Sequence, residues 1–221
     1  MRLARAAGLA LALFLLVPTL ADAQQKGEPG RFDHYVFSLS WSPSYCEAMG
    51  TRAEPEQCAR DRPFAFVAHG LWPQYENGWP QDCLTPAPFV PEPVLRSILD
   101  IMPSRRLALH QWRKHGTCSG EDPAAYFAAL RRAYERIEIP EAFRRLEGYR
   151  MVAPSEVEAA FRARNPGLTP EMISVICQGR RLTEVRVCLN RSLDFVACPQ
   201  TERSACRADR VVMPPLRARA P

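Results

Sequence analysis

Eight cysteines constrain the fold of this chain more than any other feature of its sequence. They are Cys46, Cys58, Cys83, Cys118, Cys177, Cys188, Cys198 and Cys206. An even number of cysteines behind an export signal is typical of a disulfide framework, here four bonds formed in an oxidising compartment. The alternative is a metal site, but the absence of any Cys-x-x-Cys pair argues against zinc. Spacing alone leaves roughly 100 connectivities open.

The first 23 residues predict a cleaved signal peptide. Arg2 and Arg5 precede an apolar run over residues 9–16, and Ala21-Asp22-Ala23 fits the small-x-small pattern of a signal-peptidase site. A membrane anchor is the alternative, but the run is shorter than the roughly 20 residues that span a bilayer. We therefore predict a protein that is secreted or periplasmic, with no stable membrane association after cleavage.

The length and charge of the mature chain, residues 24–221, set broad limits on its function. This length suits a single domain with a substantial core. Losing Arg2, Arg5 and Asp22 lowers the formal net charge from +5 to +4. Such a mildly basic chain is compatible with a polyanionic substrate, but it carries no block of charge that would by itself indicate nucleic-acid binding.

The N-terminal half of the mature chain predicts two strands. Residues 24–31 look like a disordered lead-in, and residues 32–41 then alternate with a period of two, as in a half-buried strand. Residues 44–63 are predicted to be a loop held by Cys46 and Cys58. Residues 64–68 form a second strand, with His69 projecting from its end.

The remaining chain mixes helices and strands without regular βαβ alternation, so the predicted class is α+β. A helix is expected from the N-cap Ser104 to His115, ended by Gly116 in a positive-φ conformation. Others begin at Asp122-Pro123 and at a capping box opened by Ser155. Strands over residues 172–177, 182–189 and 195–198 form a meander, and the tail from Val211 is peripheral.

Two short stretches carry the candidate chemistry. In the helix that ends near residue 115, His110, Gln111, Lys114 and His115 share one face. His69 follows a strand, and nearby Trp72 offers a flat π surface on which a base can stack. Each residue alone is more often structural, but three of the four histidines lie in these two stretches.

This set of side chains supplies an acid, a base and a cation but no protein nucleophile. The sequence has no Gly-x-Ser-x-Gly motif, no acidic cluster and no phosphate-binding glycine loop. RNA brings its own nucleophile, the 2′-hydroxyl beside the scissile phosphodiester. One imidazole would remove that proton while another protonates the departing 5′-oxygen, and no metal or cofactor is required.

Two nearly contiguous strings resemble the active-site segments of the ribonuclease T2 family. They are His69-Gly70-Leu71-Trp72-Pro73 and His110-Gln111-Trp112-Arg113-Lys114-His115-Gly116-Thr117-Cys118. The likeness extends to residues 40–46, 182–188 and 195–198, and covers roughly residues 35–206. It implies an α+β fold with a central antiparallel sheet flanked by helices and stapled by disulfides.

The resemblance also implies a role for each site residue. His115 would be the general base and His69 the general acid, giving a 2′,3′-cyclic phosphate and then a 3′-phosphate. Lys114 would stabilise the phosphorane and His110 would hold the phosphate. Trp72 would stack on the base upstream of the cut.

Two positions depart from the family pattern. Gln111 stands where the family usually has Glu, and it removes a negative neighbour that would raise histidine pKa values. We predict that activity survives with an altered pH profile. Gln74 stands where Asp is frequent, which affects base preference more than activity.

By the same resemblance, four disulfides are expected. The pairs are Cys46–Cys58, Cys83–Cys118, Cys177–Cys206 and Cys188–Cys198. The implied partner is RNA, bound by a monomer. Two other functions remain open: a weakly active family member that binds RNA or another anion, and a secreted metal-binding protein using His69, His110 and His115. The spacing of five between His110 and His115 disfavours the second.

Overall fold

The computed structural model describes residues 25–59 and 63–216, and the predicted signal peptide lies outside them. Within these ranges the main sheet has six strands in the order β3-β2-β7-β8-β5, with β6 paired to β7. The strands are β2 (His34–Trp41), β3 (Phe66–Gln74), β5 (Arg150–Val152), β6 (Ile173–Gln178), β7 (Arg181–Leu189) and β8 (Val211–Met213). Every pair is antiparallel except β7 with β8. The α+β prediction is confirmed.

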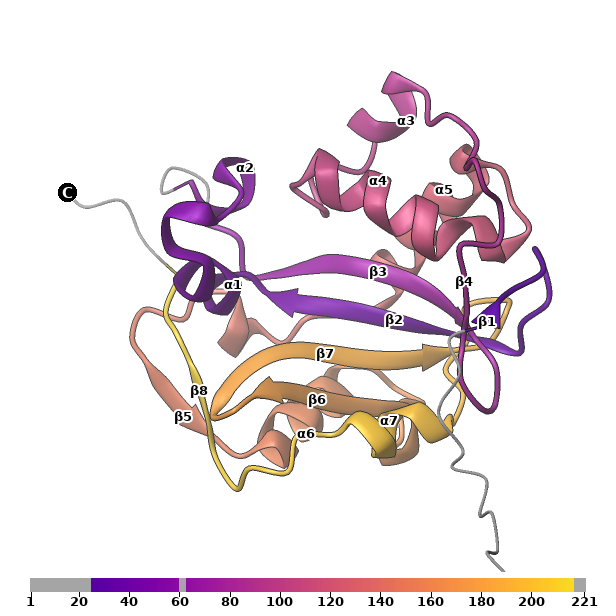
Figure 1. Cartoon of the computed structure of the whole chain (residues 1–221). Helices are drawn as coiled ribbons and strands as arrows, with labels where there is room; N and C mark the ends of the chain where they lie inside the picture. The colour runs from indigo at the N-terminus through magenta and orange to yellow at the C-terminus, as the bar shows by residue number, and fades with distance from the viewer. Residues whose placement is uncertain (1–24, 60–62, 217–221) are drawn as a thin grey trace, which may run out of the picture.

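The helices flank this sheet in two groups. Figure 1 shows α3, α4 and α5 gathered beside β3, whereas α6 and α7 lie near β6. The helices are α1 (Ser42–Met49), α2 (Pro55–Cys58), α3 (Glu92–Arg96), α4 (Arg105–Lys114), α5 (Pro123–Arg136), α6 (Pro154–Arg164) and α7 (Pro199–Ser204). Short 3₁₀ turns are η1 (Gly50–Arg52), η2 (Gly116–Ser119), η3 (Glu141–Phe143) and η4 (Pro170–Met172). Two further short strands, β1 (Gln25–Lys26) and β4 (Pro80–Gln81), pair in parallel.

Strand β2 is buried on both faces, so the prediction of a half-buried strand was wrong. One face carries aromatic and aliphatic residues, such as Phe37 and Trp41, into the main core. On the other face, Val36 packs in a second apolar cluster with Cys188 and Cys198. Because the Cys188–Cys198 disulfide packs against Val36 on this face, alternation in the sequence does not correspond to solvent exposure.

His69 lies inside β3 and not at its end, because the strand continues to Gln74. The pairing with β2 shifts at this point: Ser38 faces Gly70, and Leu39 faces Ala68, so His69 is an extra residue without a partner across the ladder. Such a bulge changes the direction of a side chain relative to the strand. The histidine is therefore positioned by a sheet irregularity that the sequence pattern did not predict.

The segment predicted to be a loop over residues 44–63 is helical in its described part. Helix α1 begins directly after β2 with Pro43 in its first turn, where the missing N–H of proline is tolerated. Gly50 ends it with a φ of 54°, and α2 returns the chain to the disulfide between Cys46 and Cys58. Proline here starts a helix after the strand, which the prediction took only as a strand stop.

The helix that carries the candidate chemistry has the predicted bounds, but Gly116 does not end it with a positive φ. Ser104 accepts a hydrogen bond from the Leu107 N–H at 3.1 Å, and α4 then runs to Lys114. Gly116 is not among the described residues with positive φ. A Cβ at this position would lie 2.4 Å from Trp112 Cε3, so glycine is needed for close packing.

The next two helices differ in how well their starts were predicted. Asp122 caps α5 by accepting from the Ala125 N–H at 2.8 Å, as expected. The capping box at Ser155 was wrong, because α6 begins at Pro154 after the N-cap Ala153. Glu156 accepts from the Ala153 N–H at 2.8 Å, whereas Glu158, the acidic partner in the predicted box, accepts from the Val175 N–H at 2.9 Å.

Both ends of the described chain are built into the fold, contrary to prediction. Gly30 N–H donates to Cys118 O at 3.0 Å, so residues 25–31 are not a disordered lead-in. Val211 and Met213 are buried in β8, which pairs with β5, so the tail is not peripheral. Residues 195–198 contribute only a bridge between Leu189 and Phe195, and not a strand.

All four predicted disulfides are present. They are Cys46–Cys58, Cys83–Cys118, Cys177–Cys206 and Cys188–Cys198. Among the described residues, no helix is long and apolar enough to cross a membrane.

Candidate active site

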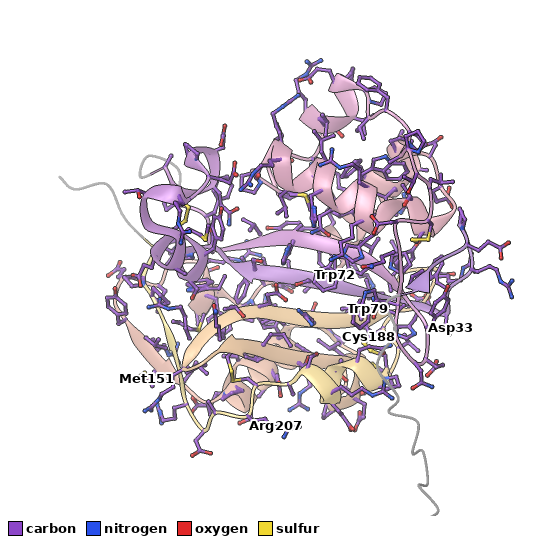
Figure 2. All side chains as sticks on the ribbon, viewed as in Figure 1. Asp33, Trp72, Trp79, Met151, Cys188 and Arg207 are labelled. Atoms are coloured by element: carbon purple, nitrogen blue, oxygen red, sulfur yellow. A yellow bond between two sulfur atoms is a disulfide. The ribbon has the colours of Figure 1, made fainter. Side chains whose placement is uncertain are left out.

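A cavity of about 470 Å³ brings the predicted chemistry together. From α4 it is lined by His110, Gln111, Lys114 and His115. From β3 and the loop that follows, it is lined by His69, Trp72, Gln74 and Trp79. Figure 2 labels Trp72 and Trp79 near each other over the strands of the main sheet, and both line this cavity. Every residue predicted for the site therefore lines this one cavity.

His69 is held by a carboxylate that the sequence analysis missed. Its Nδ1 lies 2.7 Å from Oε1 of Glu184 on β7. The second carboxylate oxygen of Glu184 accepts from Arg186 Nε at 2.8 Å. Because Nδ1 is committed to Glu184, Nε2 is the nitrogen of His69 left to meet a ligand.

Glu184 is ionised in this arrangement. Burial of its carboxyl raises the pKa, but the hydrogen bond and charge of His69, together with Arg186, outweigh burial and lower the pKa to about 2. A period of two puts Glu184 and Arg186 on one face of β7, which was visible in the sequence. The sequence pattern did not show that this face lies two strands away from His69, across β2.

Trp72 connects the two active-site segments. Its Nε1–H donates to Oε1 of Gln111 at 2.7 Å. Gly70 makes room for this bond, since a Cβ there would lie 2.2 Å from Trp72 Nε1 and 2.4 Å from Gln111 Oε1. The glycine of the His-Gly-Leu-Trp string is therefore required by the close approach of β3 to α4.

The indole ring of Trp72 already has neighbours around it. Ring centroids of His69 and His115 lie 5.4 Å and 5.5 Å away, and the Arg186 guanidinium lies 5.0 Å over the ring. A base that stacks on the face covered by Arg186 takes the place of that guanidinium. Stacking on that face therefore requires the arginine to move.

His115 is buried, with 9% of its surface exposed. Burial of the imidazole, reinforced by the positive charges of Lys114, His110 and His69, lowers its pKa to about 3. The pKa of His110 is also lowered, by burial first and then by Lys114 and Arg113. At neutral pH His115 is therefore uncharged and able to accept a proton.

Gln74 is a buried residue of the cavity lining. Its Nε2 donates to the carbonyl of Pro73 at 3.0 Å, which fixes the amide and leaves Oε1 for other partners. Further lining residues come from β7 and α7, and include Arg186, Gln200 and Arg203. The sequence analysis did not single out any of these three.

A second cavity of about 610 Å³ opens on the other side of His69 and His110. Its remaining wall includes Tyr45 and Gln57 from the α1–α2 segment, and Arg106 and Arg113 from α4. His115 and Trp72 do not line it. The two histidines that the cavities share therefore stand at the junction of a longer cleft.

In the described part of the chain, no three His, Cys, Asp or Glu side chains are grouped closely enough to hold a metal ion.

Comparison with known proteins gives this arrangement its context. The model of the Ribonuclease T2 family matches residues 32–198, which include both histidine segments and Glu184. The chain belongs to the ribonuclease T2 family. It is 34% identical over 207 residues to a ribonuclease of Aeromonas hydrophila, with 83% of this chain and 85% of that protein covered. Ribonuclease I of Escherichia coli is 27% identical over 242 residues, with 90% of each covered.

Solved structures show the same fold. RNase NT, in a complex with 5′-AMP, superposes with a TM-score of 0.59 and 26% identity, covering 84% of this chain and 99% of that one. The RNase-related protein from Calystegia sepium gives a TM-score of 0.65 at 21% identity, covering 84% of this chain and 98% of the other. The ribonuclease T2-like fold predicted from the two motifs is thereby confirmed.

Proposed function

We propose that this ribonuclease T2 family member is a metal-independent endoribonuclease that cleaves single-stranded RNA by transesterification. The 2′-oxygen attacks the adjacent phosphorus, the bond from phosphorus to the 5′-oxygen breaks, and a 2′,3′-cyclic phosphate forms. The observation that carries the proposal is the pair of imidazoles in one cavity, His115 buried and uncharged and His69 bonded to a carboxylate.

His115 is the general base in this proposal. Its pKa of about 3 keeps the imidazole neutral in the free enzyme at neutral and mildly acidic pH. It accepts the proton of the 2′-hydroxyl as the 2′-oxygen bonds to phosphorus. General-base help of this kind contributes typically about 10²–10⁴-fold.

His69 is the general acid. The carboxylate of Glu184, 2.7 Å from Nδ1, fixes the orientation of the ring and leaves Nε2 to carry the proton that is transferred. The proton on Nε2 is then transferred to the departing 5′-oxygen. Hydrolysis of the cyclic phosphate reverses the two roles, with His69 activating water and His115 protonating the 2′-oxygen, to leave a 3′-phosphate.

Charge on the phosphorane is stabilised by the donors of α4. Lys114 provides a cation, and His110 holds a non-bridging oxygen, since both line the cavity beside His69 and His115. Gln111 cannot exchange a proton. It orients Trp72 through the bond from the indole N–H to its amide oxygen.

The upstream base enters the cavity beside Trp72 and Gln74 in this proposal. Trp72 provides a π surface once Arg186 moves aside, and base stacking of this kind contributes about 1–3 kcal/mol. Gln74 offers its free amide oxygen to a base N–H, where an ionised carboxylate would provide a stronger acceptor.

The proposed setting is an exported monomer, with residues 24–221 as one catalytic domain. Four disulfides support an oxidising compartment, periplasmic or extracellular, and the leader over residues 1–23 supports export.

The proposal is tested by incubating the oxidised mature protein with single-stranded RNA, with and without a chelator, and identifying the product ends. We expect 2′,3′-cyclic or 3′-phosphate ends, insensitive to the chelator and at least about 100-fold slower to appear with His115→Ala. Tight RNA binding without cleavage would instead support the alternative of a weakly active family member that binds RNA. The feature that favours this alternative is Gln111, which stands where the family usually has Glu.

A further inference from the structure

We propose that Arg203, on α7, binds the phosphate on the 5′ side of the upstream nucleotide, so that the enzyme prefers RNA extended in that direction. This inference rests on the proposed function, because the roles of His69 and His115 define which side of the cut is upstream. It adds a second phosphate contact, separate from the scissile position at the histidines.

The two cavities give the RNA a direction. The 2′-hydroxyl that His115 activates belongs to the upstream nucleotide, and His115 lines only the cavity of about 470 Å³. The 5′-oxygen that His69 protonates belongs to the downstream nucleotide, and His69 also lines the second cavity. The upstream nucleotide therefore lies in the first cavity, and the chain continues in the 5′ direction along the wall away from α4.

Helix α7 forms that wall and is firmly attached. Disulfides hold the residues at both of its ends, Cys198 to Cys188 and Cys206 to Cys177. Between them, Gln200 Oε1 lies 3.0 Å from Nε2 of His34, and the Gln200 amide also donates to the carbonyl of Tyr75 at 2.5 Å. The backbone of α7 is thus held relative to β2 and to the loop that carries Trp79.

The charge of Arg203 suits an anionic ligand. Its Nη2 donates to the neutral amide oxygen of Asn77 at 2.8 Å. Of the described residues that line this cavity, none is Asp or Glu, while Lys114, Arg186 and Arg203 are cations. A guanidinium with free donors and no lining carboxylate nearby is a good phosphate ligand.

Arg186 is a poorer candidate for this second phosphate. Its donors are engaged by Glu184, and its guanidinium covers Trp72. Arg203 also follows the part of the chain that the family model matches, which ends at residue 198. The contact is accordingly inferred from this chain's own α7 and not from the family motifs.

The test compares binding of two dinucleotides whose upstream nucleotide lacks the 2′-hydroxyl, so that neither can be cleaved. One carries a 5′-phosphate and the other a 5′-hydroxyl. We expect the 5′-phosphate to tighten binding to the intact mature enzyme about fivefold at low salt. Arg203→Gln reduces this ratio to near one, Arg203→Lys retains part of it, and the 5′-hydroxyl compound binds all three proteins equally.

Arg207→Gln is the matched control, because this exposed arginine follows α7 closely in sequence but does not line the cavity. Figure 2 shows it at the edge of the molecule, well away from Trp72 and Trp79. The control keeps the fivefold ratio. Equal binding of both compounds by the unmodified enzyme, or a full ratio in Arg203→Gln, would overturn the inference. Because these compounds are not cleaved, failure of the ribonuclease proposal would show separately, as intact RNA in the cleavage assay.

Discussion

At the level of single residues, the proposed function of His69 depends on Glu184. A carboxylate on the far nitrogen of an imidazole fixes the orientation and the tautomer of the ring. The bond is short, 2.7 Å, and the carboxylate is largely shielded from water, with 12% of its side chain exposed. Arg186 holds the other oxygen, so the carboxylate cannot rotate freely.

We predict that Glu184→Gln lowers kcat/KM about tenfold at neutral pH, because an amide holds the His69 ring less firmly in one orientation than an ionised carboxylate does. The loss should be smaller on a substrate with sulfur in place of the bridging 5′-oxygen, which needs no general acid, whereas a loss of packing alone would lower both rates equally. Glu47→Gln is the control, since Glu47 is also shielded and paired, with Arg181 at 2.7 Å, but lines neither cavity. Equal losses on both substrates in Glu184→Gln would contradict the positioning role.

Gln111 places no negative charge beside His115. Since an amide is neutral, burial and the nearby cations lower the pKa of His115 to about 3 without an opposing charge at residue 111. Gln111→Glu would supply that charge and retain an acceptor for the Trp72 N–H.

We predict that Gln111→Glu raises the pKa of His115 by about one unit. The base must be neutral to act, so activity rises with pH through this pKa, and the acidic limb of kcat/KM should move to higher pH. The maximal rate should change less than the limb. Profiles of kcat/KM from pH 2.5 to 8 for both proteins measure the shift, and coincident acidic limbs would refute this account.

Glycines show what a sequence conveys about single residues and what it does not. Gly116 was expected to provide positive φ, whereas it is needed because Trp112 and Tyr126 leave no room for a Cβ. Gly70 has a similar reason, the hydrogen bond between Trp72 and Gln111. Whether a glycine is needed for positive φ or for close packing depends on neighbours that are distant in sequence.

At the level of elements, the sequence predicted α4 well and the strands less well. Helix α4 is capped by the neighbouring Ser104, and residues one turn apart share a face. Its bounds and its candidate site residues therefore followed from sequence spacing. The extension of β3 past His69 and the bulge depend on pairing with β2. Pairing between strands is not local information, so His69 was placed at the wrong point of the strand.

The disulfide between Cys83 and Cys118 connects the loop after β4 to η2, the turn that follows α4. The adjacent N–H of Asp82 donates to Lys114 O at 2.9 Å, so the loop is tied to the same turn that carries Lys114 and His115. The cysteines are 35 residues apart. A loop of that length is consistent with a stabilisation of about 3–4 kcal/mol.

Replacing both cysteines with serine should therefore lower the free energy of unfolding by about 3–4 kcal/mol, measured by denaturant titration. The matched control is Cys46→Ser with Cys58→Ser, whose separation of 12 residues predicts a loss of about 3 kcal/mol. A loss below about 1 kcal/mol for the first pair would contradict the stabilising role of this bond.

At the level of the whole molecule, two active-site segments are brought together by a sheet and a helix that pack across the same core. Resemblance located the fold and seven residues that line one cavity, because the two strings were long and nearly contiguous. It did not reveal Glu184, which contacts His69 from β7, or Arg186 and Arg203, which line the cavity from β7 and α7. Those contacts come from tertiary packing, and the C-terminal strand β8 was likewise visible only in the folded chain.

The assignment of base and acid is the central claim, and a substrate with sulfur in place of the bridging 5′-oxygen tests it most directly. A thiolate leaves without protonation, so such a linkage no longer needs a general acid. We predict that His69→Ala cleaves it within about tenfold of the unmodified enzyme but cleaves the oxygen linkage at least about 100-fold more slowly. His115→Ala should be slow on both substrates. Rescue of His115→Ala by sulfur, with none for His69→Ala, would mean that the two histidines have the opposite roles.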